Sequence, residues 1–134
     1  MSKLIGDIGE LEFIIRAKKL GYTALLPYSA ACVYDIAIDN GDKIIKIQVK
    51  TINALSLRRG ERVKDCYKTV IGKGRDAKSF YGEKDVDFFA IYIMKINKFF
   101  ILPFAIIESK TSRFYPEKKD HKFSKYLEKW DLLK

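Results

Sequence analysis

Two runs of alternating apolar and polar residues, joined by a short turn, constrain the fold of this chain more than any other feature. The turn is Asn40-Gly41-Asp42, and Asn-Gly supports the positive φ angles of tight hairpins. The apolar positions are Tyr34, Ile36 and Ile38 before the turn and Ile45, Ile47 and Val49 after it; the polar positions are Asp35, Asp39, Lys46, Gln48 and Lys50. Because strand side chains alternate between faces, the runs predict two paired strands with Asp35, Gln48 and Lys50 on one polar face.

That polar face would combine a carboxylate, an amide and a lysine. Hard divalent cations prefer oxygen ligands, which Asp35 and the Gln48 carbonyl can supply. A lysine such as Lys50, placed beside the cation, can orient or deprotonate a water and stabilise charge on a phosphate. A hairpin with one solvent-exposed face shows the same alternation without any catalysis. The two strands alone leave both interpretations open.

The composition favours one folded domain with a polyanionic partner. The chain has 134 residues, of which 48% are hydrophobic, enough for a single domain over 1–134 with its own core. Its formal net charge is +9. A strongly basic protein of this size favours nucleic acid as a partner, although a basic surface also serves solubility.

Several classes of protein are not favoured. No apolar run approaches the length of a membrane span, and residues 1–20 lack the layout of a signal peptide. Cys32 and Cys66 are too few and too far apart for a zinc cluster or a disulfide framework, which fits a reducing cytoplasm. The only histidine, His121, rules out a multi-histidine metal site.

A first helix is predicted over residues 2–20, with Ser2 as a possible cap and Gly21 after its end. Its predicted apolar stripe consists of Leu4, Ile8, Leu11 and Ile15. Glu10 lies at the edge of that stripe, where it can face along the sheet. Gly6 and Gly9 indicate either a close approach to the helix or simple tolerance of glycine.

The remaining segments complete an α/β layout with a mixed sheet. A short strand is predicted over 23–26, two further strands over 88–94 and 99–102, a helical turn from Pro103 to Ile107 and a final helix over 123–133. Residues 52–84 between them are strongly basic and less regular. This segment either binds phosphates or forms a solvated surface, and its Tyr67 and Phe80 either contact sugars and bases or belong to the core.

The order of elements, together with the spacing of Glu10, Asp35, Gln48 and Lys50, resembles the PD-(D/E)XK nuclease superfamily. Within it the chain is most similar to small group I intron-encoded (homing) endonucleases, and more distantly to archaeal Holliday junction resolvases. The segments that carry the resemblance are Gly6-Asp7-Ile8-Gly9-Glu10, Gly21-Tyr22, Leu26-Pro27, Tyr34-Asp35, Ile47-Gln48-Val49-Lys50-Thr51, Val86-Asp87-Phe88-Phe89-Ala90 and Ile101-Leu102-Pro103. The resemblance implies a restriction-endonuclease-like core, in which a helix is followed by a mixed central β-sheet with flanking helices.

The resemblance also implies roles for individual residues. Asp35 would be the central metal ligand, with Glu10, the Gln48 side chain and the Val49 carbonyl completing the shell around Mg²⁺ or its substitute Mn²⁺. Lys50 would act on the attacking water. The residues expected to contact nucleic acid are Ser29, Arg58, Arg59, Arg62, Lys64, Lys68, Lys73 and Arg75.

Two residues depart from the superfamily pattern. Tyr34 stands where the motif has proline, which leaves the ligands intact. Gln48 stands where the motif has a carboxylate, so the site loses one negative charge and holds Mg²⁺ less strongly; this favours one ion at a time.

The sequence therefore predicts a Mg²⁺-dependent DNA endonuclease that hydrolyses phosphodiester bonds in duplex or branched DNA. Because one small subunit offers limited surface, a homodimer or homotetramer is expected. The alternatives are a non-catalytic nucleic-acid-binding module of the same fold, and a protein directed at RNA.

Overall fold

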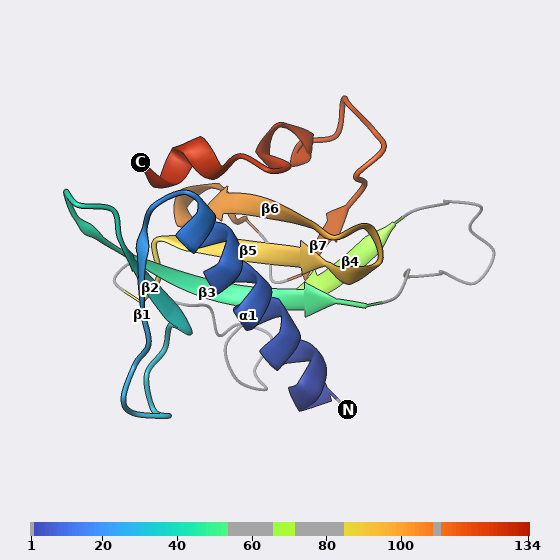
Figure 1. Ribbon diagram of the computed structural model, residues 1–134. Helices are drawn as coiled ribbons and strands as arrows, with labels where there is room; N and C mark the ends of the chain where they lie inside the picture. The colour runs from blue at the N-terminus through green and yellow to red at the C-terminus, as the bar shows by residue number, and fades with distance from the viewer. Residues whose placement is uncertain (1, 54–65, 72–84, 109–110) are drawn as a thin grey trace.

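The computed structural model describes residues 2–53, 66–71, 85–108 and 111–134. In Figure 1 a long helix crosses one face of a central sheet, and the C-terminal turns run along the sheet edge formed by its last strand. The helix is α1 (Ser2–Lys19), and the strands of the central sheet are β1 (Thr23–Leu25), β2 (Ile36–Asp39), β3 (Ile44–Ile52), β5 (Phe88–Ile93) and β6 (Lys98–Pro103). Among the described residues, no helix has both the length and the apolar character needed to cross a membrane.

The central sheet is mixed, as predicted. Its strand order is β1-β2-β3-β5-β6, in which only the β3–β5 pair is parallel and the other neighbours are antiparallel. The predicted hairpin turn is confirmed: Gly41 has φ +90°, and Asn40 Oδ1 accepts hydrogen bonds of 2.9 Å from the backbone N–H groups of Asp42 and Lys43. This turn fixes the register in which Ile36 pairs with Ile47.

The first helix ends as predicted but turns the opposite face to the sheet. Gly21 has φ +85°, and Tyr22 N–H donates to the Ala17 carbonyl at 3.0 Å, which is a Schellman C-terminus. The predicted apolar stripe is wrong, because its four members are exposed: Leu4, Ile8, Leu11 and Ile15. The buried face is instead formed by Gly9, Phe13 and Ala17. Small residues on this face let the helix lie close to the sheet.

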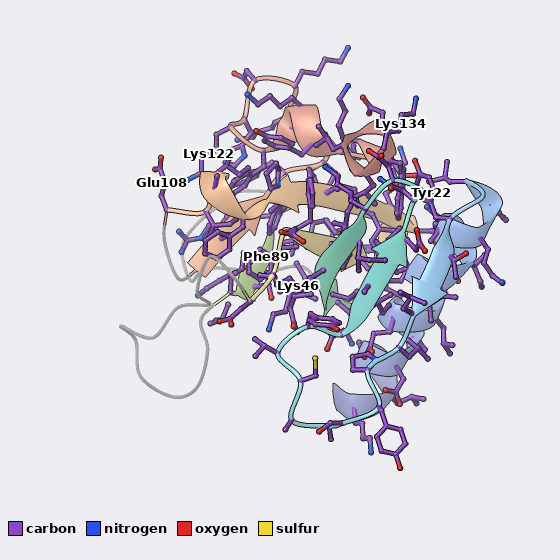
Figure 2. The ribbon with its side chains drawn as sticks, turned by 90° about the vertical axis from the view of Figure 1, so that its left-hand side faces the viewer. Tyr22, Lys46, Phe89, Glu108, Lys122 and Lys134 are labelled. Carbon is purple, nitrogen blue, oxygen red and sulfur yellow. The ribbon has the colours of Figure 1, made fainter. Side chains whose placement is uncertain are left out.

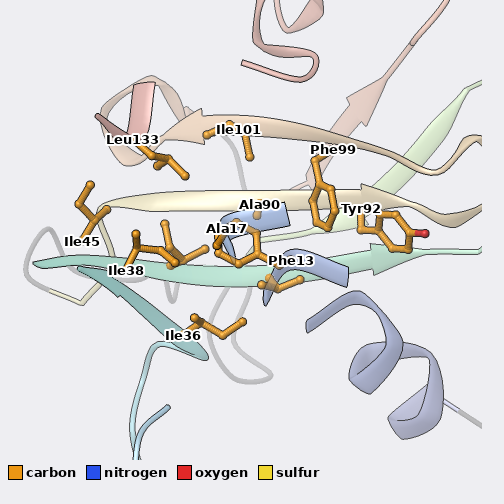
Figure 3. Close-up of a cluster of buried hydrophobic side chains, with 12 residues drawn as sticks. Phe13, Ala17, Ile36, Ile38, Ile45, Ala90, Tyr92, Phe99, Ile101 and Leu133 are labelled. Carbon is orange, nitrogen blue, oxygen red and sulfur yellow. The ribbon is translucent and has the colours of Figure 1, made fainter. Parts of the chain in front are cut away.

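Apolar clusters cover both faces of the central sheet. Under α1, Phe13 and Ala17 pack on side chains from β2, β3, β5 and β6, as Figure 3 shows. On the other face a second cluster contains Ile52, Phe89 and Phe100. Because β3 contributes to both clusters, the face of β3 that carries Gln48 is not a simple solvent-exposed surface, and Gln48 itself is buried.

Two strands that the sequence did not reveal form a separate small sheet. They are β4 (Tyr67–Val70) and β7 (Thr111–Phe114), which pair in antiparallel fashion. Tyr67 and Phe114 belong to the second cluster, so Tyr67 is a core residue. Phe80, the other aromatic residue considered for nucleic-acid contact, lies outside the described residues.

The predicted C-terminal helix is replaced by two short 3₁₀ turns, Ser124–Tyr126 and Trp130–Leu133. Between them Glu128 has φ +53°, a left-handed conformation that interrupts a helix. Its carboxylate accepts hydrogen bonds from Phe99 N–H at 2.8 Å and from Arg16 at 3.2 Å. The residue that interrupts the helix, Glu128, thus attaches the C-terminal segment to both the sheet and α1.

Candidate active site

The candidate site begins where β2 separates from β3. Asp35 lies immediately before β2, and its N–H still donates to the Ile47 carbonyl at 3.0 Å. Its side chain then replaces the missing strand partner, because Asp35 Oδ2 accepts the Val49 N–H at 3.0 Å. Val33 to Asp35 were predicted to continue the strand, but the chain bends there, and Tyr34 packs on the second cluster instead of sharing a face with Ile36. The bend directs the Asp35 carboxylate at β3.

β3 places the other predicted residues beside Asp35. Gln48 and Lys50 alternate with Val49, so both side chains project from the face opposite α1. Figure 2 labels Lys46 and Phe89, which lie on this same face; Phe89 is the register partner of Gln48. The Gln48 side chain is 9% exposed and hydrogen bonds to Asp35. Its Oε1 is buried and has no hydrogen-bond partner in the described structure.

A pocket of about 320 Å³ lies between the N-terminal half of α1 and the segment that leads into β2. In Figure 2 this segment projects below the sheet beside α1. Glu10 from the helix and Asp35 from the strand start both line the pocket, together with Ser29. The remaining lining residues are Pro27, Tyr28, Ala30, Cys32 and Tyr34. The pocket therefore joins two predicted ligands with one predicted phosphate contact.

Burial and mutual charge shift the pKa values of three of these groups. Burial is the main cause that raises the pKa of Asp35 above 3.8, opposed by the Val49 hydrogen bond, the charge of Lys50 and the Gln48 hydrogen bond. Burial also raises the pKa of Glu10 above 4.5, with the charges of Asp35 and Asp7 adding to the effect. The pKa of Lys50 is lowered from 10.5 by burial, which the charge of Asp35 partly offsets. Groups with such shifts gather at sites that bind or react.

Comparisons with known proteins identify the family and the fold of the chain. The sequence matches the PD-(D/E)XK endonuclease family over residues 1–133. The chain belongs to that family. Comparison with curated protein sequences gives no significant match. The restriction-endonuclease-like fold class predicted from the sequence is confirmed by two similar solved structures.

The first similar structure is a bacterial homing endonuclease, I-Ssp6803I, with a TM-score of 0.82 and 24% sequence identity. The alignment covers 98% of this chain and 92% of that one. The second is Hjc of Archaeoglobus fulgidus, a Holliday junction resolvase, with a TM-score of 0.50 and 15% identity over 83% of this chain and 87% of that one. At these identities both comparisons speak for the fold alone.

Nucleases of the PD-(D/E)XK family generally use divalent metal ions, and the residues present here fit such an ion. Among the described residues no three His, Cys, Asp or Glu side chains form a metal cluster. The candidate donors are the carboxylates of Glu10 and Asp35, which line the pocket, and the Gln48 amide, which hydrogen bonds to Asp35. The buried Gln48 Oε1 lacks a partner, and a buried carbonyl oxygen without one is costly unless it has a ligand. Since the carbonyl of a strand residue points to the same side as its N–H, Val49 also directs its carbonyl toward Asp35.

The residues predicted to bind nucleic acid fall into three groups. Ser29 lines the pocket, and its Oγ accepts the Ala31 N–H at 3.1 Å. Lys68 does not line the pocket; it is exposed on β4, directly opposite Arg113 of β7. The other six lie outside the described residues: Arg58, Arg59, Arg62, Lys64, Lys73 and Arg75. Sequence reasoning missed Arg113, because the short run of β7 gave no strand signal strong enough to show its neighbour.

Proposed function

We propose that this endonuclease is a metal-dependent enzyme that hydrolyses phosphodiester bonds of DNA, built as a single nuclease domain over residues 1–134. The observation that carries the proposal is the convergence of Glu10 and Asp35 on one pocket, next to the buried Gln48 side chain and Lys50. These residues come from α1, the start of β2 and β3. A purely structural hairpin does not require a carboxylate on the facing helix.

Each residue has a separate task in the proposed reaction. Asp35, Glu10, Gln48 Oε1 and the Val49 carbonyl would hold one Mg²⁺, with Mn²⁺ as a substitute. A bound ion of this kind polarises a phosphoryl oxygen and neutralises charge that develops on it. Lys50, whose pKa burial lowers, orients the attacking water and takes up its proton when the lysine is neutral. The neutral amide of Gln48 supplies less charge than a carboxylate, which favours a single ion.

The basic surface would bind the phosphate backbone. Lys68 and Arg113 are direct neighbours across β4 and β7, and like charges in that position destabilise a sheet by themselves. An anionic partner removes this repulsion. Together with Ser29 at the pocket and the predicted arginines and lysines of 58–75, Lys68 and Arg113 would account for much of the sequence-independent affinity for DNA.

The described fold supports two kinds of DNA target. The two similar structures are those of a homing endonuclease and a Holliday junction resolvase. Accordingly, we infer that this chain cuts either a specific site in linear duplex or a branched junction. The basic charge of the chain, +9, is consistent with both.

A second copy of the chain is the partner that fits the exposed face of α1. The described residues of each chain form one candidate site, whereas cutting both strands of a duplex or junction takes two. The stripe of Leu4, Ile8, Leu11 and Ile15 runs for roughly 17 Å along the helix, opposite the face that packs on the sheet. An apolar helix face of this length is typical of an interface, so we infer a homodimer, or a homotetramer assembled from such dimers.

The experiment that tests the proposal offers DNA and RNA of matched sequence to the wild type and to Asp35→Asn and Glu10→Gln, with Mg²⁺ or Mn²⁺. DNA cutting by the wild type and a loss of about 1,000-fold in both variants are expected, with DNA binding retained. Binding without cutting in either metal would favour a non-catalytic module. Preferential cutting of RNA would contradict the assignment to DNA.

A further inference from the structure

Helix α1 lies against strand β3 at a buried glycine. Gly9 is buried, and a Cβ atom added to it would lie 1.8 Å from Thr51 Oγ1 and 3.1 Å from Thr51 Cβ. Real Cβ atoms do not approach other atoms to 1.8 Å, so any residue other than glycine requires a shift of the Thr51 side chain, the helix or the strand. At Gly6, one turn earlier in the same helix, an added Cβ meets nothing within 4 Å.

Rotation of the Thr51 side chain relieves only part of this conflict. Rotation about χ1 moves Oγ1 away, but the Cβ atom stays 3.1 Å from the added carbon, and the Cγ2 methyl group must then find another place. Thr51 Oγ1 is also buried without a hydrogen-bond partner in the described structure. Because this oxygen lies so near the place of an added Gly9 Cβ atom, it faces the Gly9 backbone, where a weak Cα–H···O contact can form.

The contact joins the two elements of the candidate site at adjacent residues. Gly9 precedes Glu10, which lines the pocket with Asp35, and Thr51 follows Lys50 on the strand. Phe13, one turn after Gly9, is fully buried against the sheet and prevents the helix from tilting about this point at low cost. The separation of α1 from β3 at Gly9 consequently determines how far Glu10 reaches toward Asp35.

We propose that Gly9 is a positioning residue: its lack of a side chain lets α1 lie close to β3 at Thr51, so that the Glu10 carboxylate reaches the ion site that Asp35, Gln48 and Val49 form. The inference rests on the proposed function for the identity of that site. It assigns to the glycine a task that neither its helix propensity nor its exposure explains, since glycine in a helix interior is unfavourable.

The test compares Gly9→Ala with the matched control Gly6→Ala. Both variants replace a glycine of the same helix by alanine and gain the same helix propensity, but only the first meets Thr51. The melting temperature, the affinity for Mn²⁺ measured by titration calorimetry and the rate of DNA cutting are measured for each. Gly9→Ala should melt roughly 5 °C or more below Gly6→Ala and bind Mn²⁺ about 10-fold to 100-fold more weakly.

Rescue by Thr51→Ala separates positioning from general damage. This substitution removes the atom 1.8 Å from the added carbon and leaves only the 3.1 Å contact, which a small adjustment relieves. The double variant Gly9→Ala/Thr51→Ala should therefore regain most of the lost Mn²⁺ affinity and cutting. If Gly9→Ala alone does not fold, the double variant is compared with Thr51→Ala, and the two should bind and cut alike.

The measurements test separately the positioning role of Gly9, the part that Thr51 plays in it, and the proposed function. Equal melting temperatures and Mn²⁺ affinities for Gly9→Ala and Gly6→Ala would overturn the positioning role. A loss of affinity that Thr51→Ala does not restore would overturn Thr51 as the cause. A wild type that neither binds Mn²⁺ nor cuts DNA would overturn both the proposed function and the positioning of Glu10 for ion binding; the melting temperatures would then still report on the packing contact.

Discussion

The carboxylate of Asp35 accepts the backbone N–H of Val49 at 3.0 Å, in the place that a further residue of β2 would take in the sheet. The bond fixes the carboxylate relative to β3 without using both of its oxygens. It also ties Asp35 to the strand that carries Gln48 and Lys50. An early end to strand pairing thus produces a polar site between two well-packed apolar clusters.

Gln48→Glu tests the consequence of the neutral amide. A glutamate at this buried position adds a charge next to Asp35, so the ion-free variant should be less stable than the wild type. With a cation bound, Gln48→Glu should be the more stable of the two proteins, because the cation then has a third carboxylate ligand. Melting temperatures with and without Mn²⁺ should show a larger ion-induced rise for Gln48→Glu. An equal rise in both proteins would place Gln48 outside the ion site.

The stability of the ion-free protein should depend on pH through Asp35 and Glu10. Burial raises the pKa of Asp35 above 3.8 and the pKa of Glu10 above 4.5. The folded state therefore binds protons more readily than the unfolded chain. Their stabilising contribution is present at low pH and is lost as the pH rises through the folded values. Ion binding needs the ionised forms, so the Mn²⁺-induced rise in melting temperature should grow over the same interval. In Asp35→Asn this growth should be smaller; an unchanged profile would contradict the assignment.

Lys68→Ala and Arg113→Ala should weaken DNA binding about equally for all sequences. Each residue would contact phosphate, so each substitution should lower the slope of log affinity against log salt by about 1. The measurement is fluorescence anisotropy at several salt concentrations, with Lys95→Ala of the 3₁₀ turn Met94–Ile96 as a control outside the two strands. Unchanged slopes for both variants would move the DNA-binding surface away from the β4–β7 sheet.

Leu11→Lys should dissociate the oligomer. Leu11 is 60% exposed in the middle of the apolar stripe of α1, so a charge there should be harmless to the fold of one chain and unfavourable in an interface. Ile44→Lys, at a residue 52% exposed at the start of β3, is the matched control. Sedimentation velocity should give a monomer for the first variant alone. A wild type that sediments as a monomer at micromolar concentration would contradict the inferred dimer.

The hairpin and the parts of the site on it could be predicted because local rules govern them. Alternation placed Ile45, Ile47 and Val49 in the core, and the turn residues fixed the register that brings Asp35 to Gln48. The helix face could not be predicted in the same way. Two apolar stripes compete on α1, and the longer one stays exposed, because the sheet accepts the small residues around Gly9 and Ala17 at close range.

The C-terminal segment shows a second limit of sequence reasoning. Phe123, Tyr126, Leu127 and Trp130 have helical spacing, yet they do not form one helix. Glu128 has a left-handed conformation. Its carboxylate accepts hydrogen bonds from Phe99 N–H and, at 3.3 Å, from the Trp130 indole N–H. Tertiary hydrogen bonds of this kind can override helical spacing, and the spacing of apolar residues gives no sign of them.

A single cleavage assay tests whether Lys50 acts in cutting DNA beside Asp35. Wild type, Lys50→Ala and the control Lys46→Ala, which alters the same face of the same strand, are given a four-way junction and a pool of random-sequence duplexes with Mg²⁺ or Mn²⁺. We expect metal-dependent cutting of at least one substrate by wild type and Lys46→Ala, and a loss of at least about 100-fold in Lys50→Ala with DNA binding retained. Cutting by Lys50→Ala at the wild-type rate would contradict this role of Lys50.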